Sequence, residues 1–185
     1  MLNIKLPFKI IIFGFIFTFF SSFGQSFFIG LFNSNIRADL SITHGQFGSI
    51  YAVATLISSF SLIWIGKKID DFKLIKFSLF VILLLFFSSI YFSTVNNIYF
   101  LLVGIFLLRL SGQGLMSHTA TTSISRYFSV NRGKALSTTW LGLSAAEFVM
   151  PVTIVFLLSI YSWRDIWIYI AFLIILILPL VSFLT

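Results

Sequence analysis

The sequence predicts an all-α, polytopic membrane protein with six transmembrane helices. Of its 185 residues, 59% are hydrophobic and only 9% are charged, against about a quarter charged in soluble domains. The charges stand mainly in short segments between apolar runs, and the runs reach the length of about 20 residues that a membrane helix needs. A water-soluble domain is therefore excluded. The expected spans cover about residues 10–32, 44–66, 75–95, 98–119, 135–161 and 166–184.

The first two spans are defined by their ends. No charge lies between Lys9 and Arg37, so this apolar run is longer than the core of a secretory signal, which has about 7–15 residues. Because more spans follow, we expect it to stay in the mature protein. At the start of the second span, Thr43 and Gln46 have the spacing of a capping box, in which each side chain binds the other residue's backbone N–H.

The remaining spans are separated by turns and charged loops. Asn96 and Asn97 form a turn between the third and fourth spans. The only charge inside the fourth span is Arg109, and the only charge inside the fifth is Glu147. Pro151 also lies in the fifth span, where its missing backbone N–H should kink the helix.

The distribution of basic residues indicates the orientation. Nine lysines and arginines lie on one side of the expected membrane, and only Arg37 and Arg164 lie on the other. A basic excess marks cytoplasmic loops. Both chain ends are therefore expected in the cytoplasm, and we expect a multi-pass protein of a bacterial inner (plasma) membrane. The net charge of +7 is divided among short loops, which indicates topology and attraction to anionic lipid rather than a nucleic-acid partner. The cytoplasmic basic residues are Lys5, Lys9, Lys67, Lys68, Lys73, Lys76, Arg126, Arg132 and Lys134.

Arg109 and Glu147 are expected near the middle of the bilayer. At 1.5 Å per residue, Arg109 lies about 16 Å along its helix from Ile98. Glu147 lies about 18 Å along the next helix from Ala135. Placing a charged side chain at the centre of a membrane helix costs about 2.5–3.5 kcal/mol. In the structural interpretation, the two groups either offset this cost by forming an ion pair or face different surfaces and never meet. In the functional interpretation, Arg109 attracts an anionic group of a substrate and Glu147 accepts a transported proton.

Other polar and small residues fall at defined places in the spans. Gln113 and Ser117 follow Arg109 at intervals of four residues, so the three share a helix face. Gln25 is the matching polar residue in the first span, and its amide can bond a neighbouring helix as readily as a ligand. Small residues indicate close helix packing. They are Gly24, Gly30, Gly112, Gly114, Gly142, Ser144, Ala145 and Ala146.

No enzyme or cofactor site is evident in the sequence. Cysteine is absent, which excludes disulfides and thiolate metal sites. His44 and His118 are expected at opposite membrane faces, so they do not share a metal. The sequence has no phosphate-binding Walker loop, and His118 has no carboxylate near it in sequence for a hydrolase triad. We therefore expect a protein that is not an enzyme and has no cofactor.

Four motifs resemble those of the major facilitator superfamily of transporters. Residues 66–73, with the sequence GKKIDDFK, are similar to the family's loop between helices two and three. Residues 126–128 (RYF) and 132–136 (RGKAL) are similar to its link into helix five. Residues 162–164 (SWR) are similar to its turn before helix six. Arg109 and the GQG that soon follows it are similar to its fourth-helix motif, so the resemblance covers all six spans.

Some positions depart from the family pattern. Asp71 stands where the family usually has arginine, and Lys73 where it has glycine. These two changes alter the usual charge relay of the loop. Ala145 and Ala146 stand where antiporter members carry glycine, so an antiporter assignment is not supported.

The resemblance implies a secondary transporter of twelve helices in two halves, each with inverted three-helix repeats, which moves a small organic solute by alternating access. It places Gln25, Arg109 and Gln113 at the substrate cavity, and Gly66 and Asp70 in a gating loop. The 185 residues then form one six-helix domain, the amino-terminal half of a truncated or half-length transporter with a second half or a homodimer partner. The alternatives are a non-transporting membrane subunit or scaffold and an inactive gene remnant.

Overall fold

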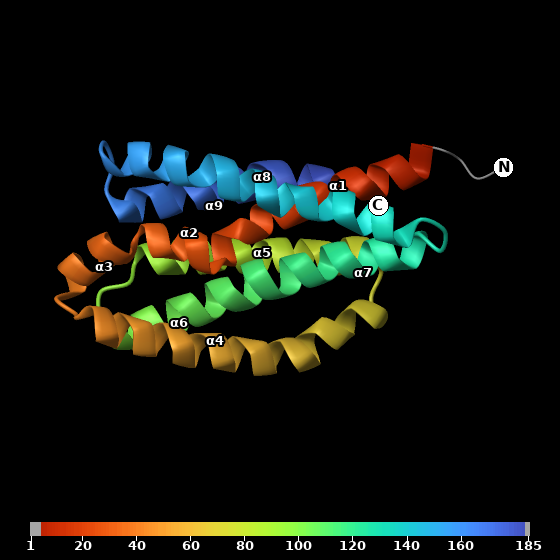
Figure 1. Ribbon diagram of the computed structural model, residues 1–185. Coiled ribbons are helices and arrows are strands. Elements are labelled where there is room, and N and C mark those ends of the chain that lie inside the picture. Colours follow the sequence, from red (N-terminus) through yellow and green to blue (C-terminus); the bar gives the residue numbers. More distant parts are fainter. Residues whose placement is uncertain (1–4, 184–185) are drawn as a thin grey trace.

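The protein is a bundle of helices. The computed structural model describes residues 5–183, and within that range every regular element is helical. The long helices lie side by side and run back and forth between the two ends of the bundle (Figure 1). α4 (His44–Lys67) lies along one edge, and α8 (Arg132–Leu158) and α9 (Trp163–Ser182) lie along the opposite edge. The predicted all-α, polytopic architecture is confirmed at this level.

Five helical runs in the described part of the chain are long and apolar enough to cross a membrane. They correspond in order to the second to sixth expected spans. The fourth expected span, 98–119, continues as helix to Tyr127, and the sixth begins at Trp163. The six-span count and the orientation stay predictions. The five runs are His44–Asp70, Leu74–Ser93, Ile98–Tyr127, Arg132–Leu158 and Trp163–Ser182.

The first expected span is not one continuous helix. Gln25 has an extended backbone, with φ −80° and ψ 155°, and it interrupts the helix. The apolar helical run before it, Phe8–Gly24, is shorter than the other five runs. Composition did not predict this break because apolar residues stand on both sides of Gln25. The segment consists of α1 (Lys5–Ser21), the 3-10 turn η1 (Ser22–Gly24), α2 (Ser26–Leu31) and α3 (Asn33–Leu40).

Side-chain caps fix the starts of three helices. At α4, Thr43 Oγ1 accepts the Gln46 N–H (3.2 Å) and Gln46 Oε1 accepts the Thr43 N–H (2.8 Å), which confirms the predicted capping box. At α6 (Ile98–Leu108), Asn97 accepts the Phe100 N–H at 3.0 Å. Ser162 caps α9 in the same way. Each cap satisfies a backbone N–H that has no partner within its own helix.

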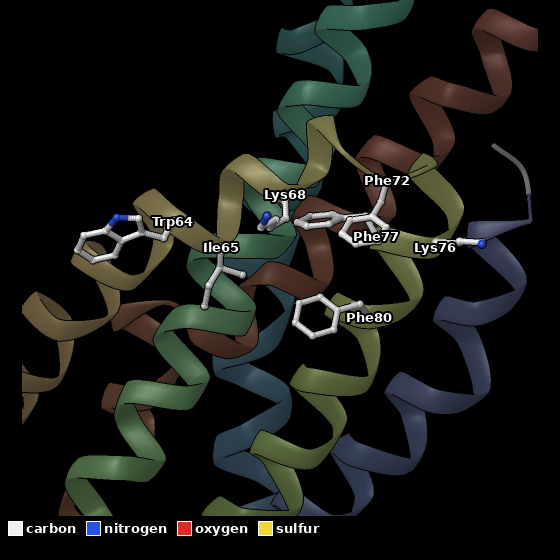
Figure 2. Close-up of a pocket in the computed structure, with 7 residues that line it drawn as sticks. All are labelled: Trp64, Ile65, Lys68, Phe72, Lys76, Phe77 and Phe80. Carbon is white, nitrogen blue, oxygen red and sulfur yellow. The ribbon is translucent and has the colours of Figure 1, made fainter.

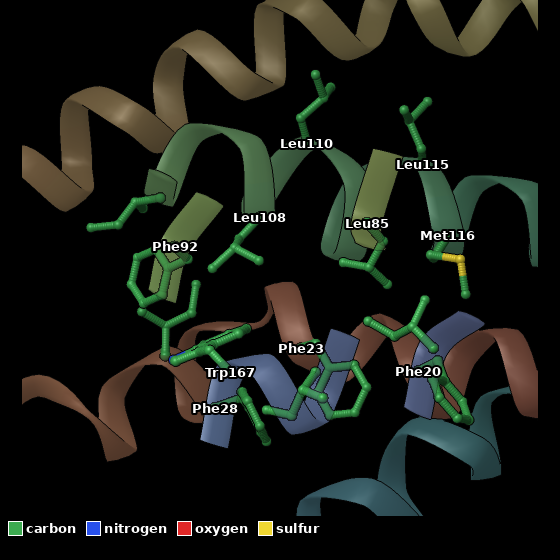
Figure 3. Packing of buried hydrophobic residues seen from close by; sticks show 14 of the residues in the cluster. Phe20, Phe23, Phe28, Leu85, Phe92, Leu108, Leu110, Leu115, Met116 and Trp167 are labelled. Carbon is green, nitrogen blue, oxygen red and sulfur yellow. The ribbon is translucent and has the colours of Figure 1, made fainter. Parts of the chain in front are cut away.

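The aromatic part of the core joins α2 and the residue after it to α5 (Leu74–Ser93) and α9. Trp167 is fully buried, and its ring centroid lies 5.6 Å from that of Phe28, 5.3 Å from Phe32 and 4.8 Å from Phe92. Figure 3 shows Trp167 packed beside Phe28 and near Phe92. Tilted and edge-on rings at these distances attract each other. The core therefore holds the segment after the helix break against two long helices.

α1 and α8 cross in close contact. A Cβ atom added to Gly142 would overlap the carbonyl oxygen of Phe15, so only glycine fits there, as its place among the small residues predicts. Beside this crossing, Thr18 Oγ1 donates a hydrogen bond to the Thr139 carbonyl oxygen at 2.6 Å. Small residues and interhelical hydrogen bonds are common means of helix association in lipid. Further along, α8 passes through Pro151 without ending.

α4 and α8 present broad apolar outer faces. Phe60 and Trp64 of α4 are 61% and 66% exposed, and Phe148 of α8 is 84% exposed. An exposed apolar face on this scale requires lipid or another protein surface rather than water. Together with the five long apolar runs, these faces identify an integral, multi-pass membrane protein.

A charged cluster ties three segments together at one end of the bundle. Asp39 at the end of α3 forms an ion pair with Arg164 at the start of α9. Arg164 Nη2 also donates to the Val95 carbonyl oxygen (2.6 Å), and Trp163 Nε1 donates to Asp39 Oδ2 (3.2 Å). The hydrogen bond from Arg164 lowers the pKa of Asp39, although desolvation opposes it.

Candidate functional site

Arg109 begins a π-helical segment in the middle of the fourth helical run. This segment, η3 (Arg109–Met116), lies between α6 and α7 (Ser117–Tyr127). Its turns are wider than those of an α-helix, and such segments are frequent at functional sites. The Arg109 residue is only 7% exposed. The chain therefore buries a guanidinium group inside the bundle.

Neutral groups from the first span and from α4 hold this guanidinium. Arg109 Nη1 donates to the Gly24 carbonyl oxygen (3.2 Å) and to Ser26 Oγ (3.3 Å). The Tyr51 ring centroid lies 5.3 Å from Arg109 Cζ, and Tyr51 Oη donates to Ser26 Oγ at 3.0 Å. A cation near the face of an aromatic ring is stabilised by the ring's electron density. Within residues 5–183, Arg109 forms no ion pair with a carboxylate.

The helix break makes the Gly24 carbonyl available to Arg109. The extended backbone at Gln25 ends the helical hydrogen-bond ladder, which leaves carbonyl groups without helical partners. Gly24 also packs directly against Gly112, where an added Cβ would lie 2.6 Å from the Gly24 nitrogen. The predicted close approach at Gly24 and Gly112 is thus confirmed. This contact brings the broken first span within reach of the arginine.

Arg109 and Gln113 line a small cavity of about 130 Å³ between α4 and η3. Three polar atoms of this region are buried and make no hydrogen bond within the described residues: Arg109 Nε, Gln113 Oε1 and Ser117 Oγ. The first is a donor and the second an acceptor. A buried polar group without a partner is costly, and the first two of these atoms belong to residues that border the cavity. Its remaining lining residues are Ser58, Ser59, Leu62 and Gly114.

A larger groove of about 460 Å³ adjoins the cavity, with which it shares Ser59 and Leu62. It follows α4 and the turn after it as far as Asp70, and His118 and Thr122 of α7 form its other wall. The two spaces together lead from Arg109 toward the basic end of the bundle.

The expected gating loop is fastened to α7. The Gly66 carbonyl oxygen accepts a hydrogen bond from His118 Nε2 at 3.1 Å. Asp70 Oδ1 forms an ion pair with Arg126 at 2.5 Å, and Arg126 also donates to the Ile69 carbonyl oxygen at 3.0 Å. The carboxylate of Asp70 thus already has a cationic partner within this chain. Its side chain is still 73% exposed, which leaves it accessible to a further partner.

The ion pair between Arg109 and Glu147 is not formed. Glu147 lies on an exposed part of α8, whereas Arg109 turns toward Gly24, Ser26 and Tyr51. The physical reason is the packing of the helices, because α8 contacts mainly α1, α7 and α2. Of the interpretations that the sequence left open, the structure therefore matches the one in which the two groups face different surfaces.

The other predicted site residues are divided. Arg109 and Gln113 share the cavity, but Gln25 is half-buried at the helix break and does not line it. Ser117 is buried one turn beyond and is also outside the lining. The assignment of Gln25, Arg109 and Gln113 to substrate binding stays a prediction, as does proton coupling by Glu147.

Sequence reasoning did not single out the residues that α4 contributes. Tyr51 and Ser58 are seven residues apart, an interval that places two residues on one helix face. This interval could have identified the face of α4 turned toward Arg109. The contact of Ser26 with Arg109 could not be predicted, because it depends on the helix break at Gln25.

One comparison with known proteins identifies the family. The family model described as Major Facilitator Superfamily matches residues 14–185. No curated protein sequence matches the chain. The members of this family are membrane transporters rather than enzymes, in keeping with the helices and apolar faces described above. The chain belongs to the Major Facilitator Superfamily.

Proposed function

We propose that the chain is one half of a secondary transporter that binds a small organic anion at Arg109 and moves it by alternating access. The observation that carries this proposal is the buried guanidinium, which has neutral partners and an Nε–H that is unpaired among residues 5–183. A buried charge without an opposite charge is unfavourable, above all at membrane depth. A carboxylate, phosphate or sulfonate in the cavity would offset that cost.

The second unsatisfied atom narrows the chemistry of the solute. Gln113 Oε1 is a buried acceptor without a partner in the described residues, and Gln113 borders the same cavity as the arginine. It would accept a hydrogen bond from a hydroxyl or amino group adjacent to the anionic group. At about 130 Å³, the cavity suits one small acidic group, so the rest of the solute would lie in the adjoining groove or against a second half.

The outer faces support a partner for this half. We propose that the exposed apolar faces of α4 and α8 are covered by a second transporter half or by a second copy of the chain. Glu147 lies on the exposed part of α8, where a carboxylate facing lipid would be costly. Under a covering half it would be sheltered and available as the proton-coupling group. Asp70 would then gate the cavity against that half.

Thermal stabilisation by small anions tests the role of Arg109. A ligand at 100 times its Kd stabilises the folded state by about 2.7 kcal/mol, so the purified protein is screened in detergent with small carboxylates, phosphates, sulfonates and matched neutral compounds. Arg109→Gln should remove the stabilisation by the best anion. Arg132→Gln, which removes an exposed positive charge outside the cavity, should retain it.

Two results would contradict the proposal. One is a solute that stabilises the wild type and Arg109→Gln equally, because its binding would not involve the guanidinium. The other is a screen in which only neutral or cationic solutes stabilise the protein.

A further inference from the structure

An apolar groove opens between α4 and α5 near the turn that joins them. Its volume is about 520 Å³, and its walls come from the end of α4, the loop after it and the start of α5 (Figure 2). Each of these helices packs against the fourth helical run. The groove is lined by Trp64, Ile65, Lys68, Phe72, Lys76, Phe77 and Phe80.

The apolar part of this lining is accessible from outside the bundle. Trp64, Phe72 and Phe80 are 66%, 53% and 47% exposed. Aromatic side chains are enriched where a membrane meets water, because their rings suit the headgroup level. The groove lies where one apolar helical run ends and the next begins, which is where the lipid headgroups are expected.

Two lysines stand among these aromatic residues, Lys68 from the turn after α4 and Lys76 from α5. Lys68 Nζ pairs with Asp71 at 3.2 Å, but both side chains are more than 60% exposed. Exposed pairs of this kind contribute little, so a phosphate can replace the carboxylate. Residues 67–76 hold four lysines against two aspartates, and one of those aspartates is paired with Arg126.

A second groove on α5 provides an internal comparison. Its volume is about 430 Å³, close to that of the first, and none of the described residues that line it is charged. Its lining consists of Leu84, Phe87, Ser88, Ile90, Tyr91, Thr94 and Leu107. Both grooves can take an acyl chain, but only the first offers cations for a headgroup.

From this combination we infer that the groove between α4 and α5 binds one anionic phospholipid. An acyl chain lies against Phe77 and Phe80, and the phosphate lies at the rim of the groove near Lys68. The Lys76 amine points away from the groove (Figure 2) and reaches the phosphate by a change of rotamer. Basic sites between membrane helices bind anionic headgroups in this manner. The site is separate from the Arg109 cavity, with which it shares no lining residue.

Trp64 lies in the groove and reports its occupant through quenching of its fluorescence by brominated lipid. The protein is reconstituted in phosphatidylcholine that contains either brominated phosphatidylglycerol or brominated phosphatidylcholine. A Trp64→Phe variant measures the signal of the other tryptophans, and the difference gives the Trp64 part. We expect brominated phosphatidylglycerol to quench Trp64 at a lower mole fraction than brominated phosphatidylcholine does. The preference should fall as salt is added.

Two double variants that remove the same charge distinguish a specific lipid site from general attraction of anionic lipid to the basic surface of the protein. Each lysine that contacts the phosphate is expected to contribute about fivefold in binding, so Lys68→Gln/Lys76→Gln should lower the preference about 30-fold, and each single variant about fivefold. Lys67→Gln/Lys73→Gln removes the same charge from the same loop without touching the groove lining, and should keep the preference. Far-UV circular dichroism checks that the helices are retained.

Three outcomes would overturn the inference. Equal quenching of Trp64 by the two lipids would show that the headgroup charge is not recognised. An equal loss in the two double variants would show attraction by the whole basic surface. No quenching by either lipid would show that protein rather than lipid covers the groove.

Discussion

The contact between Gly24 and Gly112 allows the sharpest test of the site's architecture, through Gly112→Ala. The added methyl group would lie 2.6 Å from the Gly24 nitrogen and 2.7 Å from its Cα. Ordinary contact begins at 3.4 Å, so the two segments must separate by about 0.8 Å. Both partners are backbone, and no rotamer change relieves the overlap. The same separation lengthens the 3.2 Å hydrogen bond from Arg109 to the Gly24 carbonyl beyond hydrogen-bond range.

The expected loss of stability follows from these two effects. Overpacking of this kind costs about 1–3 kcal/mol, and an interhelical hydrogen bond in a membrane protein is worth about 0.6 kcal/mol. Alanine regains up to about 1 kcal/mol through its better helix propensity. Gly48→Ala in α4 provides the control, because a Cβ there meets nothing within 4 Å while the propensity gain is similar. The difference between the two variants should therefore be about 2–4 kcal/mol.

The free energy of unfolding, measured by titrating dodecyl sulfate into mixed micelles, gives this difference directly. Gly112→Ala should be the less stable variant, and it should also show weaker stabilisation by the anion that binds the wild type. If Gly112→Ala were as stable as Gly48→Ala, the close crossing of the first and fourth spans would be refuted, and with it the account of how Arg109 reaches the Gly24 carbonyl.

Two further predictions concern the carboxylates. The pKa of Asp39 is lowered from 3.8 in the folded protein, so its stabilising effect is complete above pH 3.8 and is lost as the pH falls through the folded-state pKa. The melting temperature of the wild type should therefore decrease below about pH 4. Asp39→Asn should remove the part of this decrease that Asp39 causes. An identical acid profile in the two proteins would contradict this assignment. Glu147→Gln should leave anion binding in detergent unchanged but abolish the response of uptake to a pH gradient in proteoliposomes, and persistent coupling would exclude Glu147 as the proton site.

Much of the fold could be predicted from the placement of charges. Apolar runs between charged loops indicated the long helices, and the spacing of Thr43 and Gln46 indicated where the second span begins. These signals are local, since a cap or a helix end depends on residues a few positions apart. The burial of Arg109 was predictable for a similar reason, because a mid-span charge is costly in lipid wherever it stands.

The partners of Arg109 could not be predicted, because they depend on how helices pack. The break at Gln25 has no proline to mark it, and it arises where the first span meets the fourth at two glycines. The depths of Arg109 and Glu147 along their helices did match, but depth does not determine rotation about the helix axis. A rotation places Glu147 outside the bundle and leaves the arginine among neutral groups.

The neutral surroundings of Arg109 also favour binding over a purely structural role. A structural arginine is most stable when its donors are all paired and a carboxylate balances its charge. Among the described residues, Nη1 donates to Gly24 and Ser26, whereas Nε has no partner. The arginine also borders a cavity. The two bonds come from the segment on either side of the helix break, so an anion that draws the guanidinium into the cavity would loosen that segment. In the transporter that we propose, such loosening would couple anion binding to a movement of the first span, as alternating access requires.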